Sequence, residues 1–243
     1  MSQKLKILKV VDPPNSKKKA LDPRLPQPPS LVLMIMPTKT GKSTIISNML
    51  LNKSFYGQDF FDETTIISTT INNDQTSRFM KQAFNTYDYY SDDLIKDIIK
   101  SQNKYAKEDM PSMCLVCDDC LGEKTTALNN LSSRYRHYNI DLFIVSSQLL
   151  KKVSPTIRAN ANWILCGRLT NEAELEKLSE EWSGMFGGDK NFREQYKLCT
   201  KKRYDFMTLK LTENPAQCWR NFDVQVYPLG PSESDGESSE EED

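Results

Sequence analysis

The stretch that decides the fold is Leu31–Thr44, LVLMIMPTKTGKST, in which an apolar run breaks into a polar loop ending in Gly-Lys-Ser-Thr. The six apolar residues Leu31–Met36 predict a buried strand, and the residues from Lys42 to Leu51 predict a helix. A loop of this kind between a strand and a helix is typical of phosphate binding, because the first amides of the helix face an anion. The sequence therefore raises the hypothesis of nucleotide binding.

The residue types of the loop assign individual roles in ATP and Mg²⁺ binding. Gly41 lets the backbone approach a phosphate, Lys42 can reach the β- and γ-phosphates, and the Ser43 hydroxyl can ligate Mg²⁺. The expected nucleotide-binding residues are Pro37, Thr38, Lys39, Thr40, Gly41, Lys42, Ser43 and Thr44. The alternative is an ordinary helix N-terminus with a capping Ser or Thr.

The loop departs from the pattern G-x-x-x-x-G-K-[ST] at two places. Met36 stands where the first glycine is expected, and Lys39 stands where many such loops carry another glycine. Either the loop tolerates a bulkier entry, or its affinity for nucleotide is reduced.

A second apolar run, Met113–Cys117, ends in the carboxylates Asp118 and Asp119, as a Walker B strand does. If this strand lies beside the loop-bearing strand, Asp118 can hold Mg²⁺ and Asp119 can orient the attacking water. The alternative is that the two aspartates cap the turn toward Gly122. The order of the two motifs favours nucleotide hydrolysis.

A third apolar run, Leu142–Ser146, leads to Gln148, which can sense the γ-phosphate or the lytic water from the carboxyl end of a strand. Arg134, Arg136 and Arg158 flank this run, and any of them can act on a neighbouring subunit's nucleotide as an arginine finger. The alternatives are a surface loop for Gln148 and solvated helix ends for the arginines.

Short apolar runs alternate with longer amphipathic ones, which predicts a mainly parallel sheet covered on both faces by helices. Further strands are expected at Thr65–Ser68 and Trp163–Cys166. After residue 188 a helix over Asn191–Cys199 precedes two β-like runs, Tyr204–Leu211 and Cys218–Val226, which predict a closing hairpin. The other expected helices are Thr76–Asn85, Ser91–Tyr105, Thr125–Tyr135 and Asn171–Trp182.

Composition predicts one domain of residues 31–230 between two appendages. Of the 243 residues, 1–30 are rich in Pro and Lys and predict an extended basic arm, while the Ser/Glu/Asp-rich residues 231–243 predict a disordered acidic tail. No apolar run approaches the roughly 20 residues that span a bilayer, so we expect no membrane insertion and no secretion. The six cysteines sit mostly in apolar stretches, which predicts reduced thiols.

The succession Met36–Ser43, Leu115–Asp119, Arg136–Ile140, Ser146–Gln148 and Ile157–Ala161 resembles the genome-packaging ATPases of large eukaryotic DNA viruses and virophages, in the FtsK–HerA branch of P-loop proteins. The resemblance runs from about Leu31 to Tyr227. It implies an α/β three-layer P-loop fold of the ASCE type, with an extra strand between the two Walker strands.

The same resemblance implies a homo-oligomeric ring that hydrolyses ATP to drive double-stranded DNA into a preformed capsid. Its partners would be DNA and a capsid vertex or other virion proteins, in the host cytoplasm, the virus factory or the virion. Two alternatives stay open: a virion assembly protein that binds nucleotide with weak or no turnover, and a small P-loop nucleotide kinase.

Overall fold

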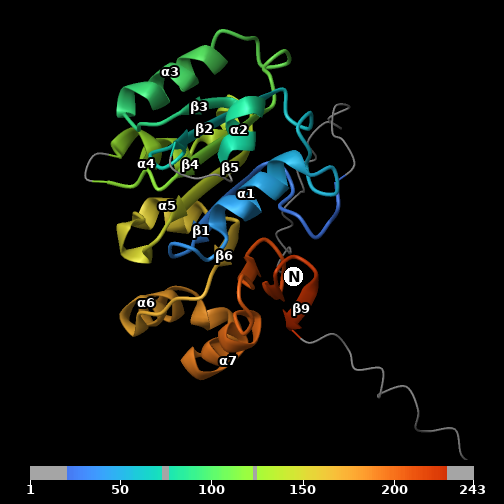
Figure 1. Cartoon of the computed structure of the whole chain (residues 1–243), viewed down its shortest axis with the longest axis vertical. Helices are drawn as coiled ribbons and strands as arrows, with labels where there is room; N and C mark the ends of the chain where they lie inside the picture. The colour runs from blue at the N-terminus through green and yellow to red at the C-terminus, as the bar shows by residue number, and fades with distance from the viewer. Residues whose placement is uncertain (1–20, 73–76, 123–124, 229–243) are drawn as a thin grey trace, which may run out of the picture.

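The computed structural model describes residues 21–72, 77–122 and 125–228, which form a nine-stranded sheet in the order β3-β2-β4-β5-β1-β6-β7-β8-β9 (Figure 1). β1 to β6 run parallel, whereas β7, β8 and β9 are antiparallel. The strands are β1 Ser30–Ile35, β2 Glu63–Ser68, β3 Asn85–Tyr87, β4 Met113–Asp118, β5 Ile140–Ser147, β6 Trp163–Cys166, β7 Met207–Lys210, β8 Gln217–Arg220 and β9 Val224–Tyr227.

Helices cover both faces of this sheet, with α3 at one end of the molecule and α6 and α7 at the other (Figure 1). The α-helices are α1 Lys42–Leu51, α2 Ser77–Ala83, α3 Asp92–Gln102, α4 Thr126–Ser132, α5 Pro155–Asn160, α6 Glu172–Trp182 and α7 Asp189–Cys199. Three short 3₁₀ turns, Tyr135–Tyr138, Leu150–Lys152 and Ser183–Phe186, complete the described elements.

The central strand β1 divides the core into two apolar layers because its side chains alternate between the faces of the sheet. Leu31, Leu33 and Ile35 pack with apolar residues of α3 to α7, while Val32 and Met34 pack with those of α1 and α2. All of β1 is buried, as a central parallel strand requires. The predicted α/β three-layer architecture with a mainly parallel sheet is confirmed.

The strand β5 lies between β1 and β4, so the loop-bearing strand and the strand of Asp118 are not direct neighbours. This is the extra strand that the family resemblance implies. Since all three strands are parallel, their carboxyl ends still meet at one edge of the sheet. Asp118 and Gln148 therefore reach the loop from the ends of β4 and β5.

Several predicted boundaries are wrong in detail. The run Cys218–Val226 is two strands, because Asn221 adopts a left-handed backbone with φ 55 and turns the chain between β8 and β9. The helix expected to reach Tyr135 ends at Ser132, where the hydroxyls of Ser132 and Ser133 bond back to carbonyls three residues earlier. The short elements β3 and α5 were not predicted, and Thr76 lies outside the described residues.

Part of the predicted arm packs onto the core of the domain. Leu25 is buried in the same layer as α1, and Tyr56 donates a hydrogen bond of 2.5 Å to the Pro26 carbonyl. Residues 1–20 and the predicted acidic tail, 231–243, lie outside the described residues. Among the residues that are described, no helix has the length and apolar character needed to cross a bilayer.

Candidate functional site

The loop between β1 and α1 places a helix N-terminus at the carboxyl edge of the sheet. Gly41 caps α1 with φ 99, a left-handed conformation that favours glycine, and its carbonyl accepts the first helical hydrogen bond, from Ile45. The loop is braced by Thr40, whose hydroxyl donates to the Pro37 carbonyl at 2.7 Å. The first amides of α1 thus face the space beyond the carboxyl edge of the sheet, where an anion would be stabilised.

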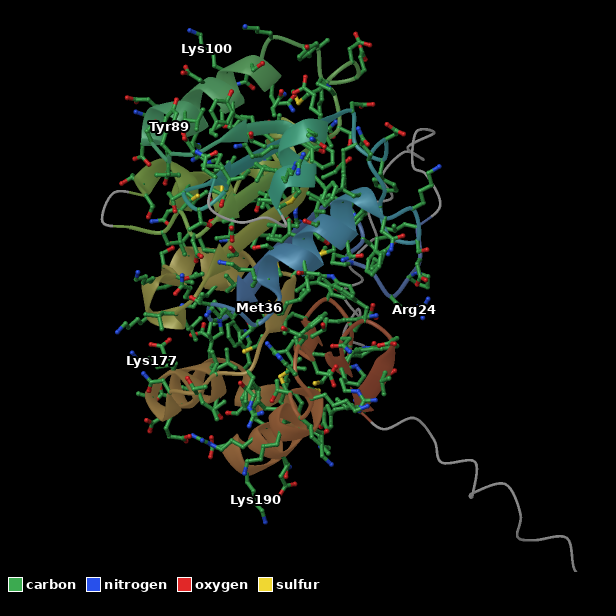
Figure 2. All side chains as sticks on the ribbon, viewed as in Figure 1. Arg24, Met36, Tyr89, Lys100, Lys177 and Lys190 are labelled. Carbon is green, nitrogen blue, oxygen red and sulfur yellow. The ribbon has the colours of Figure 1, made fainter. Side chains whose placement is uncertain are left out.

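Met36, at the position where a glycine was expected, is accommodated in the core of the domain. Its side chain is fully buried in the α1 layer of the core, and its amide donates 2.9 Å to the Ser147 carbonyl of β5. Figure 2 shows Met36 near the centre of the molecule, whereas Lys100 and Lys190 mark its two ends.

Gly167, just after β6, provides the room that Met36 needs. A β-carbon added to Gly167 would lie 3.2 Å from Met36 Cγ and 3.2 Å from Thr40 Oγ1, which is tighter than ordinary packing. The second departure, Lys39, adopts φ 64, a conformation in which glycine is usual. The loop between β1 and α1 therefore forms although two non-glycine residues stand where glycine is expected.

Lys42, the first residue of α1, joins the loop to the carboxylates at the end of β4. Its ammonium lies 3.0 Å from Asp118 Oδ1 and pairs even more closely with Asp119 Oδ2. The side chains of Lys42 and Asp118 are only 10% and 9% exposed, so the cation and the carboxylate are largely shielded from water. Asp119 follows β4 with φ 51, which turns its carboxylate toward the lysine.

Two serine hydroxyls from neighbouring strands hold the carboxylate of Asp118. Ser68, the last residue of β2, donates to Asp118 Oδ2 at 2.9 Å, and Ser146 of β5 donates to Asp118 Oδ1. Because each oxygen accepts a hydroxyl, the orientation of this carboxylate is fixed by the strands on either side of β4.

Gln148 connects the carboxylate of Asp119 to the loop. Its side-chain amide donates to Asp119 Oδ2 at 3.3 Å, and its side-chain carbonyl accepts from the Thr38 hydroxyl at 3.2 Å. Thr38, Gln148, Asp119, Lys42 and Asp118 therefore form one connected line of polar contacts across the edge of the sheet. These predicted residues come together although they lie in three separate parts of the chain.

The donor set of this edge suits magnesium bound with a nucleotide. Mg²⁺ prefers oxygen ligands, and in nucleotide sites it is held by one or two carboxylates, a hydroxyl and the phosphates themselves. Ser43 and Asp118 offer such a hydroxyl and carboxylate, while Lys42 supplies a cation beside them. Among the described residues no group of three or more His, Cys, Asp or Glu forms a cage for a metal by itself.

The three predicted arginines lie away from this cluster. Arg134 and Arg136 precede β5 and are therefore at the amino edge of the sheet, opposite Gln148. Both are exposed, and the Arg136 guanidinium lies 5.4 Å from the centre of the Tyr135 ring. Arg158, in α5, pairs with Glu181 of α6.

Sequence reasoning missed Ser68, Ser146, Gly167 and Tyr204. The two serines had a signal, since each is a polar residue at the carboxyl end of an apolar run. Tyr204 had none: it comes from the segment before β7, is 55% exposed with φ 70, and lies against Gly41, 3.5 Å from the position of an added β-carbon. The Arg203 guanidinium lies 4.7 Å from the centre of its ring.

The curated proteins similar to this chain come from invertebrate iridescent viruses. The chain is 29% identical over 166 residues to the uncharacterized protein 075L of Invertebrate iridescent virus 6, covering 64% of this chain and 61% of that protein. It is 27% identical over 163 residues to the uncharacterized protein 088R of Invertebrate iridescent virus 3, covering 64% and 60%. The match thus spans about three fifths of the length of these relatives. No family model matches the chain.

Solved structures with the same fold include viral and bacterial ATPases. The genome-packaging NTPase B204 of Sulfolobus turreted icosahedral virus 2, in complex with AMP, superposes with a TM-score of 0.57 at 18% identity, covering 78% of this chain and 96% of that one. The cytoplasmic domain of the type VII secretion ATPase EccC from Thermomonospora curvata superposes with a TM-score of 0.50 at 13% identity, covering 84% and 26%. The chain therefore has the fold of the P-loop ATPases, as its sequence predicted.

Proposed function

We propose that this chain is a Mg²⁺-dependent ATPase that drives double-stranded DNA into a viral capsid. The observation that carries the proposal is the convergence of Lys42, Asp118, Asp119 and Gln148 at the carboxyl edge of the sheet, directly beside the N-terminus of α1. In this reading the residues 37–44 bind the phosphates. The viral relatives and the fold shared with a genome-packaging NTPase support the packaging role.

Each residue of the cluster has a distinct part in hydrolysis. Lys42 would turn from the carboxylates to the β- and γ-phosphates. Ser43 and Asp118 would hold the Mg²⁺, whose chemistry would be to neutralise phosphate charge. Asp119 orients the attacking water and accepts its proton. Gln148, which contacts both Asp119 and Thr38, couples the presence of the γ-phosphate to the conformation of the loop.

A ring of subunits would bring an arginine to each nucleotide from the neighbouring subunit. Arg134 and Arg136 suit this role because they are exposed at an edge remote from their own site. Arg158 suits it less well, since Glu181 already pairs with it. A complementation assay tests the arrangement: Arg134→Ala/Arg136→Ala subunits mixed with Asp119→Asn subunits should hydrolyse ATP, because mixed interfaces contain an intact site and an intact finger. Mixtures as inactive as their components would contradict it.

The packaging role is tested by the response of ATP hydrolysis to double-stranded DNA. A motor should hydrolyse ATP faster when double-stranded DNA is added, and should sediment as a ring in the presence of nucleotide. A kinase would instead transfer phosphate to a nucleoside or nucleotide, and an assembly protein would bind ATP without turnover. In the infected cell we expect the protein in the cytoplasm or virus factory, or in the virion.

A further inference from the structure

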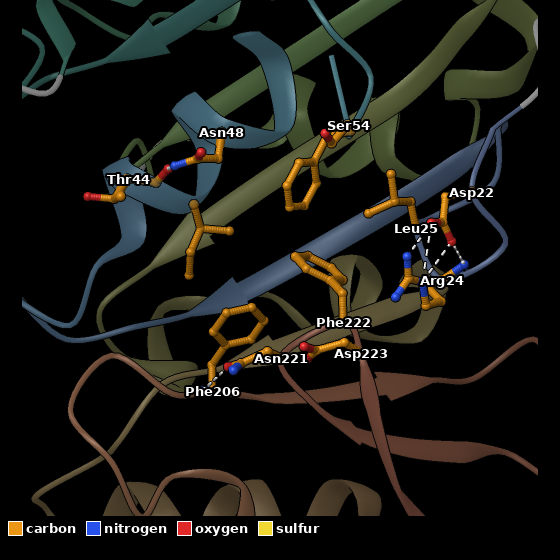
Figure 3. A pocket seen from close by; sticks show the side chains of 12 residues that line it. Asp22, Arg24, Leu25, Thr44, Asn48, Ser54, Phe206, Asn221, Phe222 and Asp223 are labelled. Atoms are coloured by element: carbon orange, nitrogen blue, oxygen red, sulfur yellow. Dashed lines mark hydrogen bonds and ion pairs between the residues drawn. The ribbon is translucent and has the colours of Figure 1, made fainter. Parts of the chain in front are cut away.

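An open cavity of about 400 Å³ lies beside the first turns of α1, where the predicted phosphate-binding residues end (Figure 3). One side is formed by Thr44, Ile45 and Asn48 of α1, and the other by Phe206 and Phe222 next to the antiparallel strands. Leu25 and its neighbours in the N-terminal segment close one end. This volume is within the range of roughly 300–1,000 Å³ that is typical of small-molecule pockets.

The cavity adjoins the proposed phosphate site, because one of its lining residues directly follows a residue of that site in the sequence. Thr44, which lines the cavity, directly follows Ser43, which we assign to Mg²⁺. A ligand with its phosphates in the loop would therefore leave the rest of its body at the mouth of this cavity. The cavity thus lies where the nucleoside half of a nucleotide would be placed.

The wall of the cavity is aromatic. The Phe206 and Phe222 rings meet edge to face with centres 5.3 Å apart, and Phe55 meets Phe222 in the same manner at 5.8 Å. Phe206 is buried, whereas Phe55 and Phe222 are partly exposed, and all three line the cavity. Flat rings of this kind bind nucleobases by stacking and by apolar contact, with little dependence on the identity of the base.

Each amide side chain of the wall makes at least one hydrogen bond within the protein. Asn48 donates to the Thr44 carbonyl at 2.9 Å. Asn221 donates to Asp205 at 3.1 Å and accepts from the Phe206 amide at 3.1 Å.

The charged side chains of the lining are Asp22, Arg24 and Asp223. Asp22 pairs with Arg24, and this contact lowers the pKa of Asp22 to about 2. Exposed Ser54 and Asp223 are the remaining polar side chains of the lining apart from Thr44. The lining therefore presents more apolar than polar surface to a base.

From this wall we infer that the cavity binds the base and ribose of purine nucleotides in general, so that the protein accepts ATP and GTP with similar affinity. The inference rests on the proposed function, because it needs the phosphates in the loop after β1. A pocket that binds mainly by shape discriminates weakly between ligands of the same shape, whereas one built on hydrogen bonds discriminates strongly. The single-ring pyrimidines bury less apolar surface and bind more weakly.

The test compares ATP, GTP, CTP and inorganic tripolyphosphate by calorimetry in Mg²⁺ buffer, with the full chain and three variants. Wild type should bind ATP and GTP within about tenfold of each other. Phe222→Ala should weaken both purine nucleotides by about tenfold and leave tripolyphosphate unchanged, because only the base loses its contact. Phe222→Tyr, which keeps the ring, should bind like wild type.

Phe79→Ala is the matched control, since Phe79 is 62% exposed on α2 and does not line the cavity. ATP binding more than 100-fold tighter than GTP binding would overturn the inference while leaving the proposed function intact. Equal loss of ATP and tripolyphosphate in Phe222→Ala, or no loss of either, would overturn it in the same way. A wild-type protein that binds neither ATP nor tripolyphosphate would overturn the proposed function as well.

Discussion

Lys42 Nζ lies 3.0 Å from Asp118 Oδ1, across the strand β5 that separates the loop after β1 from the end of β4. The contact is possible because the carboxyl ends of these parallel strands meet at one edge. Both side chains are largely shielded from water, so removing either partner would leave a buried charge without its counterion. This pair therefore defines the centre of the site.

Lys42→Ala should abolish ATP binding, because the variant lacks the cation that faces the β- and γ-phosphates. The expected loss of affinity is at least about 100-fold, measured by calorimetry with Mg²⁺. Lys100→Ala is the control: Lys100 is an exposed lysine of α3, outside the loop, and its replacement should leave affinity unchanged. Wild-type affinity in Lys42→Ala would show that the loop does not hold the phosphates.

Asp119→Asn should keep ATP binding and stop turnover. The amide has nearly the shape of the carboxylate but cannot accept a proton, and loss of a general base lowers rates by roughly 10²–10⁴-fold. Phosphate release and ATP affinity are measured on the same preparation, with Asp93→Asn, an exposed aspartate of α3, as the control. Full turnover in Asp119→Asn would remove this residue from the mechanism.

Ser146→Ala and Ser68→Ala should raise the Mg²⁺ concentration that gives half-maximal activity by about tenfold, because each removes a hydroxyl that orients the Asp118 carboxylate. Activity at saturating Mg²⁺ should recover much of its wild-type value. Ser133→Ala serves as the control, since the hydroxyl of this exposed serine donates to the Asn130 carbonyl near the end of α4, away from Asp118. An unchanged Mg²⁺ dependence in both serine variants would argue against Asp118 as the metal ligand.

Gly167→Ala should weaken nucleotide binding, although Gly167 is not one of the residues predicted to bind nucleotide. The added methyl group would press on Met36 and Thr40, which shape the loop, and overpacking of this kind costs about 1–3 kcal/mol. Gly184→Ala is the control, because a β-carbon there meets no atom within 4 Å. Thermal melting separates loss of fold from loss of affinity, and equal nucleotide affinity in the two variants would contradict this role of Gly167.

The sequence predicts the parallel core well because the runs that form β1, β4 and β5 are continuous and apolar, and such runs are typical of strands buried on both faces. It also predicts Lys42, Asp118, Asp119 and Gln148 as site residues, since the last three stand at the ends of such runs and Lys42 follows the loop after the first run. The topology of parallel strands then brings them to one edge. The position of each residue relative to an apolar run in the sequence was enough to predict it.

The contacts that complete the site depend on packing between distant segments. Gly167 matters only because it faces Met36, and Tyr204 only because the segment before β7 returns to Gly41. The split of the predicted run Cys218–Val226 likewise depends on the left-handed backbone of Asn221, whose side chain is held by Asp205 and Phe206. No periodicity in the sequence encodes these relationships.

The most direct test of the central claim is phosphate release from Mg²⁺-ATP by the purified chain, with and without double-stranded DNA and with Asp119→Asn as the inactive reference. Hydrolysis should require Mg²⁺, rise when double-stranded DNA is added and be absent in Asp119→Asn. Hydrolysis that is undetectable in wild type, or identical in wild type and Asp119→Asn, would contradict the central claim.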